Sequence, residues 1–163
     1  QLQGVGDVLD IDSHRQKAAS PRRIRLTDTH NTAMKRLPEW FETHRLGLFI
    51  HWGLYALDGW HEQAQWRRGV PRREYEALAR RFDPAAFRPD DWIDLAEAGG
   101  MSSLCFTAKH HDGFCLWDTD RTDFKITNTP YGKDILAELA EACHRRGMKL
   151  RLYYSIVDWH HPN

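Results

Sequence analysis

Three short apolar runs, separated by segments with helical periodicity, constrain the fold more than any other feature of the sequence. The runs are LGLFIHWG, SSLCFTAK and MKLRLYYS, which begin at residues 46, 102 and 148. Consecutive apolar positions of this length indicate strands that are buried on both faces. Apolar residues recur at helical spacing in the segments 71–82, 89–100 and 133–147. Strands that alternate with helices predict an α/β fold with a parallel sheet and crossover helices.

Polar and aromatic residues gather where each apolar run ends. His51 and Trp52 close the first run, Lys109, His110 and His111 close the second, and Tyr153, Tyr154 and Ser155 close the third. In a TIM barrel the active site lies at the C-terminal ends of the strands. This pattern favours a (β/α)8 TIM barrel, of which the chain holds about the first three β/α units, since a whole barrel takes about 250 residues.

The charge balance and the hydropathy exclude several classes of partner. The chain has 23 basic and 23 acidic residues, which gives no electrostatic case for a nucleic acid or an anionic membrane. No apolar run approaches the roughly 20 residues that a membrane span needs. The N-terminus shows no signal-peptide pattern, so the sequence leaves localisation open. Cys105, Cys115 and Cys143 lack zinc-like spacing and are expected to be small buried hydrophobic residues.

The composition divides the chain into two parts. Residues 1–30 are polar with scattered apolar positions, and we expect a poorly ordered leader there. Residues 31–163 carry the predicted strands and helices, and we interpret them as the N-terminal part of a barrel domain that is incomplete at its C-terminus.

A metal site is one interpretation of the histidines. The candidates are His51, His110, His111, His160 and His161, and no HExxH motif is present. Adjacent residues of a regular strand point to opposite faces, so His110 and His111 reach one site only if the chain turns at Gly113. The sequence therefore predicts no metal and no other cofactor.

A pair of catalytic carboxylates is a second interpretation. The acids near the strand ends are Asp58, Glu62, Asp112, Asp118 and Asp158. A glycosidase needs two carboxylates that flank the scissile bond, and the spacing of these acids selects no pair. For Asp58, Asp118 and Asp158, a role in turns or ion pairs is the better default.

A site for a polar ligand with an apolar face is the third interpretation and the favoured one. A neutral histidine offers one donor and one acceptor, so two histidines can hold several hydroxyl groups, with Phe114 and Trp117 as an apolar surface. We expect His51, His110 and His111 to bind the ligand, and His160 and His161 to be structural. In the loop at 59–68, Glu62, Gln65 and Trp66 could cover the ligand, or Arg67 and Arg68 could pair with nearby acids.

Several blocks of the sequence together resemble the α-L-fucosidases of glycoside hydrolase family 29. They are WFETHRLGLFIHWGLYAL, KHHDGFCLWDT and the GKD and YYS segments, in this order, within residues 38–163. The resemblance implies a (β/α)8 barrel and retaining hydrolysis of α-L-fucosides without a metal. The expected partner is a fucosylated glycan or a small fucoside.

The resemblance also assigns binding roles to individual residues. It implies that His51, His110 and His111 bind the fucose hydroxyls, that Trp66 contacts the sugar, and that Tyr154, preferred over Tyr153, lines the site. Many members have a glutamate directly before this tryptophan; here that residue is Gln65, and Glu62 is the nearest acid. Arg151 stands where the family commonly has glycine, and inside a barrel this cation would need an anionic partner.

The resemblance places the catalytic groups outside the chain. The family's nucleophilic aspartate lies on the fourth strand and its acid/base follows later, so both are expected after Asn163. The chain alone is then expected to be an inactive fragment that lacks the C-terminal part of the barrel. Its unpaired strand edges and exposed apolar helix surface predict poor solubility or oligomerisation. The alternatives are a non-catalytic fucose-binding module and a metal-dependent barrel hydrolase. The family allows a secreted, periplasmic or lysosomal location.

Overall fold

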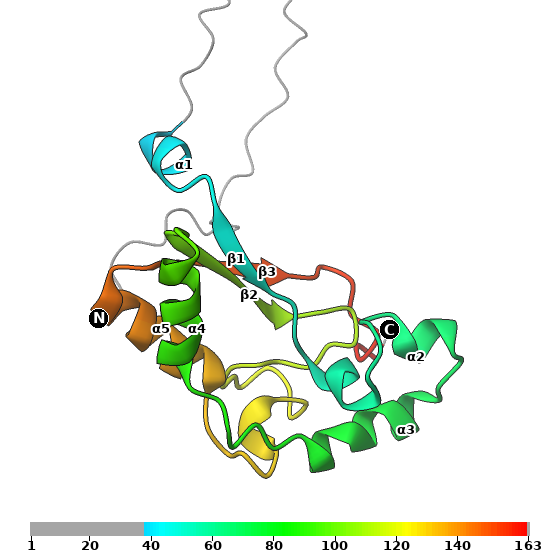
Figure 1. Cartoon of the computed structure of the whole chain (residues 1–163). Helices are drawn as coiled ribbons and strands as arrows, with labels where there is room; N and C mark the ends of the chain where they lie inside the picture. The colour runs from blue at the N-terminus through cyan, green and yellow to red at the C-terminus, as the bar shows by residue number, and fades with distance from the viewer. Residues whose placement is uncertain (1–37, 163) are drawn as a thin grey trace, which may run out of the picture. The chain divides into compact units, whose positions relative to one another are not determined.

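The computed structural model describes residues 38–162, so the predicted leader at 1–30 lies outside the described part of the chain. Its centre is a parallel sheet in which β1 (Gly47–Ile50), β2 (Ser103–Lys109) and β3 (Lys149–Tyr154) lie in sequence order (Figure 1). The predicted strands and their parallel pairing are therefore confirmed. The described sheet is open and has three strands, which is part of an α/β layer and no closed barrel.

The helices follow the predicted segments, with differences where they are short. They are α1 (Glu39–Thr43), η1 (Leu54–Asp58), α2 (Ala64–Arg67), α3 (Arg72–Glu76), η2 (Ala77–Arg81), α4 (Pro89–Ala98), η3 (Ile126–Asn128) and α5 (Ile135–Arg146). The single helix predicted at 71–82 is an α-helical turn followed by the 3-10 segment η2, and η1, α2 and η3 were not predicted. None of the described helices is long and apolar enough to cross a membrane.

Helices α4 and α5 lie side by side and pack on one face of the sheet (Figure 1). The Asp134 carboxylate accepts a hydrogen bond from the backbone N–H of Ala137 at 2.8 Å and so caps α5, which ends at Gly147 with φ of 68°. The core between these helices and the sheet includes Ile93, Ala96, Leu104, Phe106, Ile135, Leu139 and Cys143. This core fixes the strands whose C-terminal ends carry the predicted site.

The two faces of the sheet have different neighbours. Leu48, Leu104 and Leu150 are in register across the strands and pack with the core. Phe49, Cys105 and Arg151 are in register on the other face. Arg151 is only partly buried, and its Nη2 donates to the carbonyl oxygen of His44 at 3.1 Å. The three cysteines are free thiols; Cys115 and Cys143 are buried as expected, whereas Cys105 is only partly buried because it lies on the other face of the sheet.

Candidate functional site

The ends of β1 and β2 bring His51 and His110 together. Parallel strands present their C-terminal ends at one edge of a sheet, and the two imidazole rings meet edge-on with centroids 5.0 Å apart. The Thr107 hydroxyl accepts a hydrogen bond from the backbone N–H of Trp52 at 2.8 Å, which ties the end of β1 to β2. Trp52 itself points away from His51 and packs against Phe82 and Trp92 in the core.

A tight turn after β2 adds His111 to this cluster. The backbone N–H of Gly113 donates to the carbonyl of His110 at 3.1 Å, and Gly113 has φ of +82°, a conformation that favours glycine. The rings of His110 and His111 are 4.3 Å apart. The chain therefore turns at Gly113. The sequence predicts that both histidines reach one site only with such a turn.

The hydrogen bonds of the backbone determine which nitrogen of each ring carries the proton. The backbone N–H of His111 donates to Nδ1 of His110 at 2.8 Å, so the proton of neutral His110 lies on Nε2. The Ser155 hydroxyl donates its only proton to the carbonyl of Val157, so Nδ1 of His111 is the donor in its 2.6 Å contact with Ser155 Oγ. His110 then offers an Nε2–H donor, and neutral His111 offers an Nε2 acceptor.

Burial keeps His110 uncharged. Burial is the largest cause that lowers the pKa of His110, to about 4, and the neighbouring His111 and His51 lower it further. At neutral pH this ring is therefore a hydrogen-bond donor without a charge.

Glu62 faces the same cluster from the loop after β1. Its Oε2 lies 3.8 Å from Nε2 of His51, which leaves the two groups just beyond hydrogen-bond distance. Burial raises the pKa of Glu62, but a backbone hydrogen bond and the neighbouring His51 and His110 outweigh burial, so the pKa lies below its usual value. Glu62 is therefore an ionised acceptor beside the donor of His110.

These three groups are close enough to suggest a metal site, but their chemistry does not fit one. Ligand atoms of His51, Glu62 and His110 all lie within 4.8 Å of one another. A metal-binding imidazole needs a free lone pair, and Nδ1 of His110 already accepts a hydrogen bond while Nε2 carries the proton. His110 is arranged to bind a hydrogen-bond acceptor, and the set as a whole fits a hydroxyl-bearing ligand.

Aromatic side chains line this cluster on the same face of the sheet. The ring of Tyr153 stacks on His110, with centroids 4.9 Å apart, and meets Phe49 at 6.2 Å. Tyr55 packs against His51 at 5.3 Å. Sequence reasoning missed Tyr55 because it lies beyond the end of β1, in the 3-10 segment η1, which was not predicted.

The resemblance favoured Tyr154 over Tyr153 as the tyrosine that lines the site, but Tyr153 is the one whose ring contacts His110. A register shift between Thr107 and Lys109 pairs Tyr154 with Lys109, whose Nζ lies 4.9 Å from the Tyr154 ring centroid. Tyr154 also contacts Trp117, at 6.1 Å. Tyr153, in register with Thr107, is the tyrosine that meets His110.

Trp66 lies near the cluster but is separated from it by Trp159. Its side chain is 68% exposed and lines a pocket of about 280 Å³ together with Gln65, Val70 and Trp159. Trp159 contacts the ring of His111 at 5.3 Å and donates its backbone N–H to the His111 carbonyl at 2.7 Å. The loop at 59–68 thus stands next to the segment that supports His111.

The remaining candidates have structural partners. Asp118 binds Lys125 at 2.8 Å, Asp158 binds Lys109 at 3.2 Å, and Nδ1 of His160 lies 2.7 Å from the carboxylate of Glu76. Asp112 accepts hydrogen bonds from Tyr75 and from the backbone of Phe114. Phe114, expected to face a ligand, is only 2% exposed and packs in the core, because it follows the turn on the buried side.

Comparisons with known proteins agree on one family. A family model described as Alpha-L-fucosidase matches residues 13–163. The tissue alpha-L-fucosidase of Homo sapiens is 29% identical over 164 residues, which cover 90% of this chain and 35% of that protein. The plasma alpha-L-fucosidase of Rattus norvegicus is 31% identical over 144 residues, which cover 77% and 31%. The chain thus spans about a third of the length of these curated relatives.

Solved structures give the same result. Alpha-L-fucosidase isoenzyme 1 from Paenibacillus thiaminolyticus matches with a TM-score of 0.73 and 46% identity, over 76% of this chain and 29% of that one. A variant of alpha-L-fucosidase AlfC from Lactobacillus casei, in complex with Fuca(1,6)GlcNAc, matches with a TM-score of 0.72 and 39% identity, over 76% and 42%.

Proposed function

The chain belongs to the α-L-fucosidase family, and on that premise we propose that it forms the fucose-binding part of a (β/α)8 glycoside hydrolase. Three parallel strands whose C-terminal ends share one cluster of polar groups support the barrel, since barrels build their sites at that edge. The proposed reaction is retaining hydrolysis of α-L-fucosides. The proposed substrates are fucosylated glycans or small fucosides.

The observation that carries this proposal is the complementary hydrogen bonding of His110, His111 and Glu62. His110 offers an N–H donor, while His111 and the Glu62 carboxylate offer acceptors. A sugar hydroxyl both donates and accepts, so neighbouring hydroxyls can be satisfied by such a set. L-Fucose is a 6-deoxy sugar, and its methyl group suits the apolar surface of Phe49 and Tyr153 beside His110.

Glu62 is assigned to binding and not to proton transfer. The general acid of a glycosidase has a raised pKa, whereas a backbone hydrogen bond and the neighbouring histidines hold the pKa of Glu62 below its usual value. Asp112 is enclosed by its own hydrogen bonds and faces no open site. We therefore assign neither the nucleophile nor the acid/base to a described carboxylate.

We propose that Trp66 and Trp159 form one wall of the site, on the side away from β1. Both indoles line one pocket, and Trp159 adjoins His111. Flat aromatic faces bind sugar rings well, so this loop would contact the substrate. A ligand with a second sugar, such as the Fuca(1,6)GlcNAc bound by the AlfC variant, would test that contact.

The test is a chimera in which residues 38–162 replace the matching segment of the Paenibacillus enzyme, so that the rest of the site is supplied whatever follows Asn163. We expect the chimera to hydrolyse 4-nitrophenyl α-L-fucopyranoside, and His110→Ala or His111→Ala to lower kcat/KM by about tenfold or more. His144→Ala, on the exposed last turn of α5, is the control and should change little.

Three results would count against the proposal. If the histidine variants keep kcat/KM within about twofold, these residues do not bind the sugar. Fucose binding without hydrolysis would indicate a binding module. Loss of activity on chelation would indicate a metal-dependent enzyme.

A further inference from the structure

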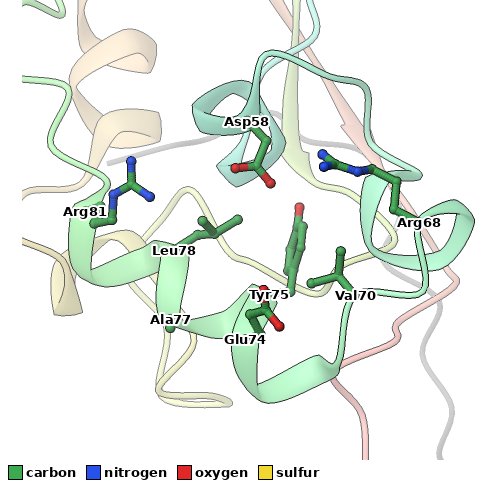
Figure 2. A pocket seen from close by; sticks show the side chains of 8 residues that line it. All are labelled: Asp58, Arg68, Val70, Glu74, Tyr75, Ala77, Leu78 and Arg81. Atoms are coloured by element: carbon green, nitrogen blue, oxygen red, sulfur yellow. The ribbon is translucent and has the colours of Figure 1, made fainter.

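A single buried hydrogen bond ties helix α3 to the turn that carries His110 and His111. Tyr75 Oη donates to Asp112 Oδ2 at 2.8 Å, and both side chains are buried. Tyr75 lines a pocket of about 320 Å³. Figure 2 shows the Tyr75 ring beside Val70 and Leu78, with its phenolic end toward Asp58. Packing on its ring holds the Tyr75 hydroxyl in place, so the hydroxyl can act as a fixed anchor.

Asp112 connects the Tyr75 hydroxyl to the backbone of the turn. Its other oxygen, Oδ1, accepts the backbone N–H of Phe114 at 3.1 Å, while the N–H of Gly113 closes the turn on His110. The backbone N–H of His111 in turn donates to the His110 ring. A shift of Asp112 would therefore move both imidazoles.

The same helix also supports the segment after β3. Oε1 of Glu76 lies 2.7 Å from Nδ1 of His160, and Arg72 donates to the carbonyl of His160. The carboxylate of Asp158 accepts the backbone N–H of His160 at 2.9 Å and pairs with Lys109 at the end of β2. Helix α3 thus reaches the supports of both His110 and His111.

A buried carboxylate at position 112 is expected to lower the stability of the fold. The groups around it are Tyr75 from α3, Lys109 from β2 and Asp158 from the segment after β3, and burial raises the pKa of Asp112 to about 6. A buried anion destabilises the fold unless its partners offset desolvation, and an apolar side chain of similar size often does better. Such costs are usual where a group serves the site.

We propose that Tyr75 and Asp112 are positioning residues, which hold His110 and His111 in the geometry that binds the sugar. Tyr75 acts through Asp112, and neither side chain contacts the substrate. The inference rests on the proposed function for the identity of the ligand. The hydrogen bonds that define the positioning role do not depend on it.

The test compares the 163-residue chain with its Tyr75→Phe, Asp112→Asn and double variants. An NMR titration measures the affinity for L-fucose, and hydrogen exchange of the Trp159 amide reports its bond to the His111 carbonyl. We expect Tyr75→Phe to weaken L-fucose binding by about five- to tenfold, the usual effect of one hydrogen bond. The rate of hydrogen exchange at the Trp159 amide should rise by a similar factor, while the amides of α5 keep their protection from exchange.

Two further comparisons, with the double variant and with a control tyrosine, test whether the effect of Tyr75→Phe runs through Asp112. In the Asp112→Asn background, Tyr75→Phe should have less than about a twofold effect, because residues that act as a unit are not additive. Tyr131→Phe is the matched control, since Tyr131 Oη also donates to a carboxylate, that of Glu138 at 3.0 Å, and contacts none of the histidines of the site. It should leave L-fucose affinity and Trp159 exchange unchanged.

The proposal is wrong if Tyr75→Phe behaves like Tyr131→Phe, or if its effect persists without Asp112. It is also wrong if exchange rises equally in α5, because that result would show general destabilisation. If the unmodified chain does not bind L-fucose, L-fucose binding by this part of the site alone fails, while the chimera still tests the proposed function and exchange at Trp159 still decides the positioning role.

Discussion

His110 and Asp112, two residues apart in the same turn, carry pKa shifts with opposite consequences for stability. The pKa of His110 falls to about 4 from 6.5, so the unfolded chain binds more protons and stability decreases as pH falls through that window. The pKa of Asp112 rises to about 6 from 3.8, so the folded state binds more protons and stability increases as pH falls through that window. The two effects largely offset each other in mild acid.

Removing either group should expose the effect of the other. Relative to the unmodified chain, Asp112→Asn should lose stability as pH is lowered from about 7 to about 4.5, because it lacks the proton uptake of Asp112. His110→Gln should gain relative stability over the same range. Urea unfolding gives the free energy of unfolding of the three proteins at both pH values. If the difference between each variant and the unmodified chain is the same at both pH values, the assigned pKa shifts are wrong.

Single residues also show where sequence reasoning reaches its limit. The position of His51, His110 and His111 at one edge of the sheet could be predicted because each follows a strand, and the ends of parallel strands meet at one edge. Tyr153 and Tyr154 could not be told apart, because the register shift opposite Thr107 decides which one meets His110. Phe114 resembled a ligand contact by composition, but the turn at Gly113 directs it into the core.

Among the elements, those with strong periodicity were predicted within a few residues. Helices α4 and α5 and strands β2 and β3 have long apolar patterns and clear end signals, such as Gly147 after α5. The short segment α2 and the change from α3 to η2 have no such signal, because tertiary contacts determine helices of only a few residues.

The turn that follows β2 and carries His110 and His111 should be the element most sensitive to substitution. A Cβ at Gly113 would overlap the Asp158 carboxylate and lie 2.6 Å from Cβ of His160, in addition to the positive φ. We expect Gly113→Ala to lower the free energy of unfolding by about 3 kcal/mol or more.

Gly147→Ala is the matched control for this turn. Gly147 also has a positive φ, of 68°, but a Cβ there would have nothing within 4 Å. We expect it to cost about 1 kcal/mol, from backbone strain alone. Denaturant unfolding measures both variants, and equal losses would show that the close approach of the loops is not as described.

At the scale of the whole molecule, the described sheet leaves its outer strands paired on one side only. Leu152 and Ile156, on and after β3, are exposed, and Ile156 is 95% exposed. Such edges are typical of a sheet that continues, which agrees with the proposed barrel and with a chain that spans about a third of its relatives. The sequence could place the strands and the site at one edge, but the strand count of a barrel is a property of the whole domain.

The proposed role of this chain depends on L-fucose binding at the C-terminal edge of the sheet. An NMR titration that follows the imidazole signals of His51, His110 and His111 tests this directly, with D-fucose as the control. D-Fucose is the mirror image, so its polarity is the same and only its handedness differs. We expect L-fucose to shift these signals and to bind about tenfold more tightly or better, as lost hydrogen bonds would require. Equal responses to the two enantiomers, or no response to either, would contradict specific binding of L-fucose at this edge.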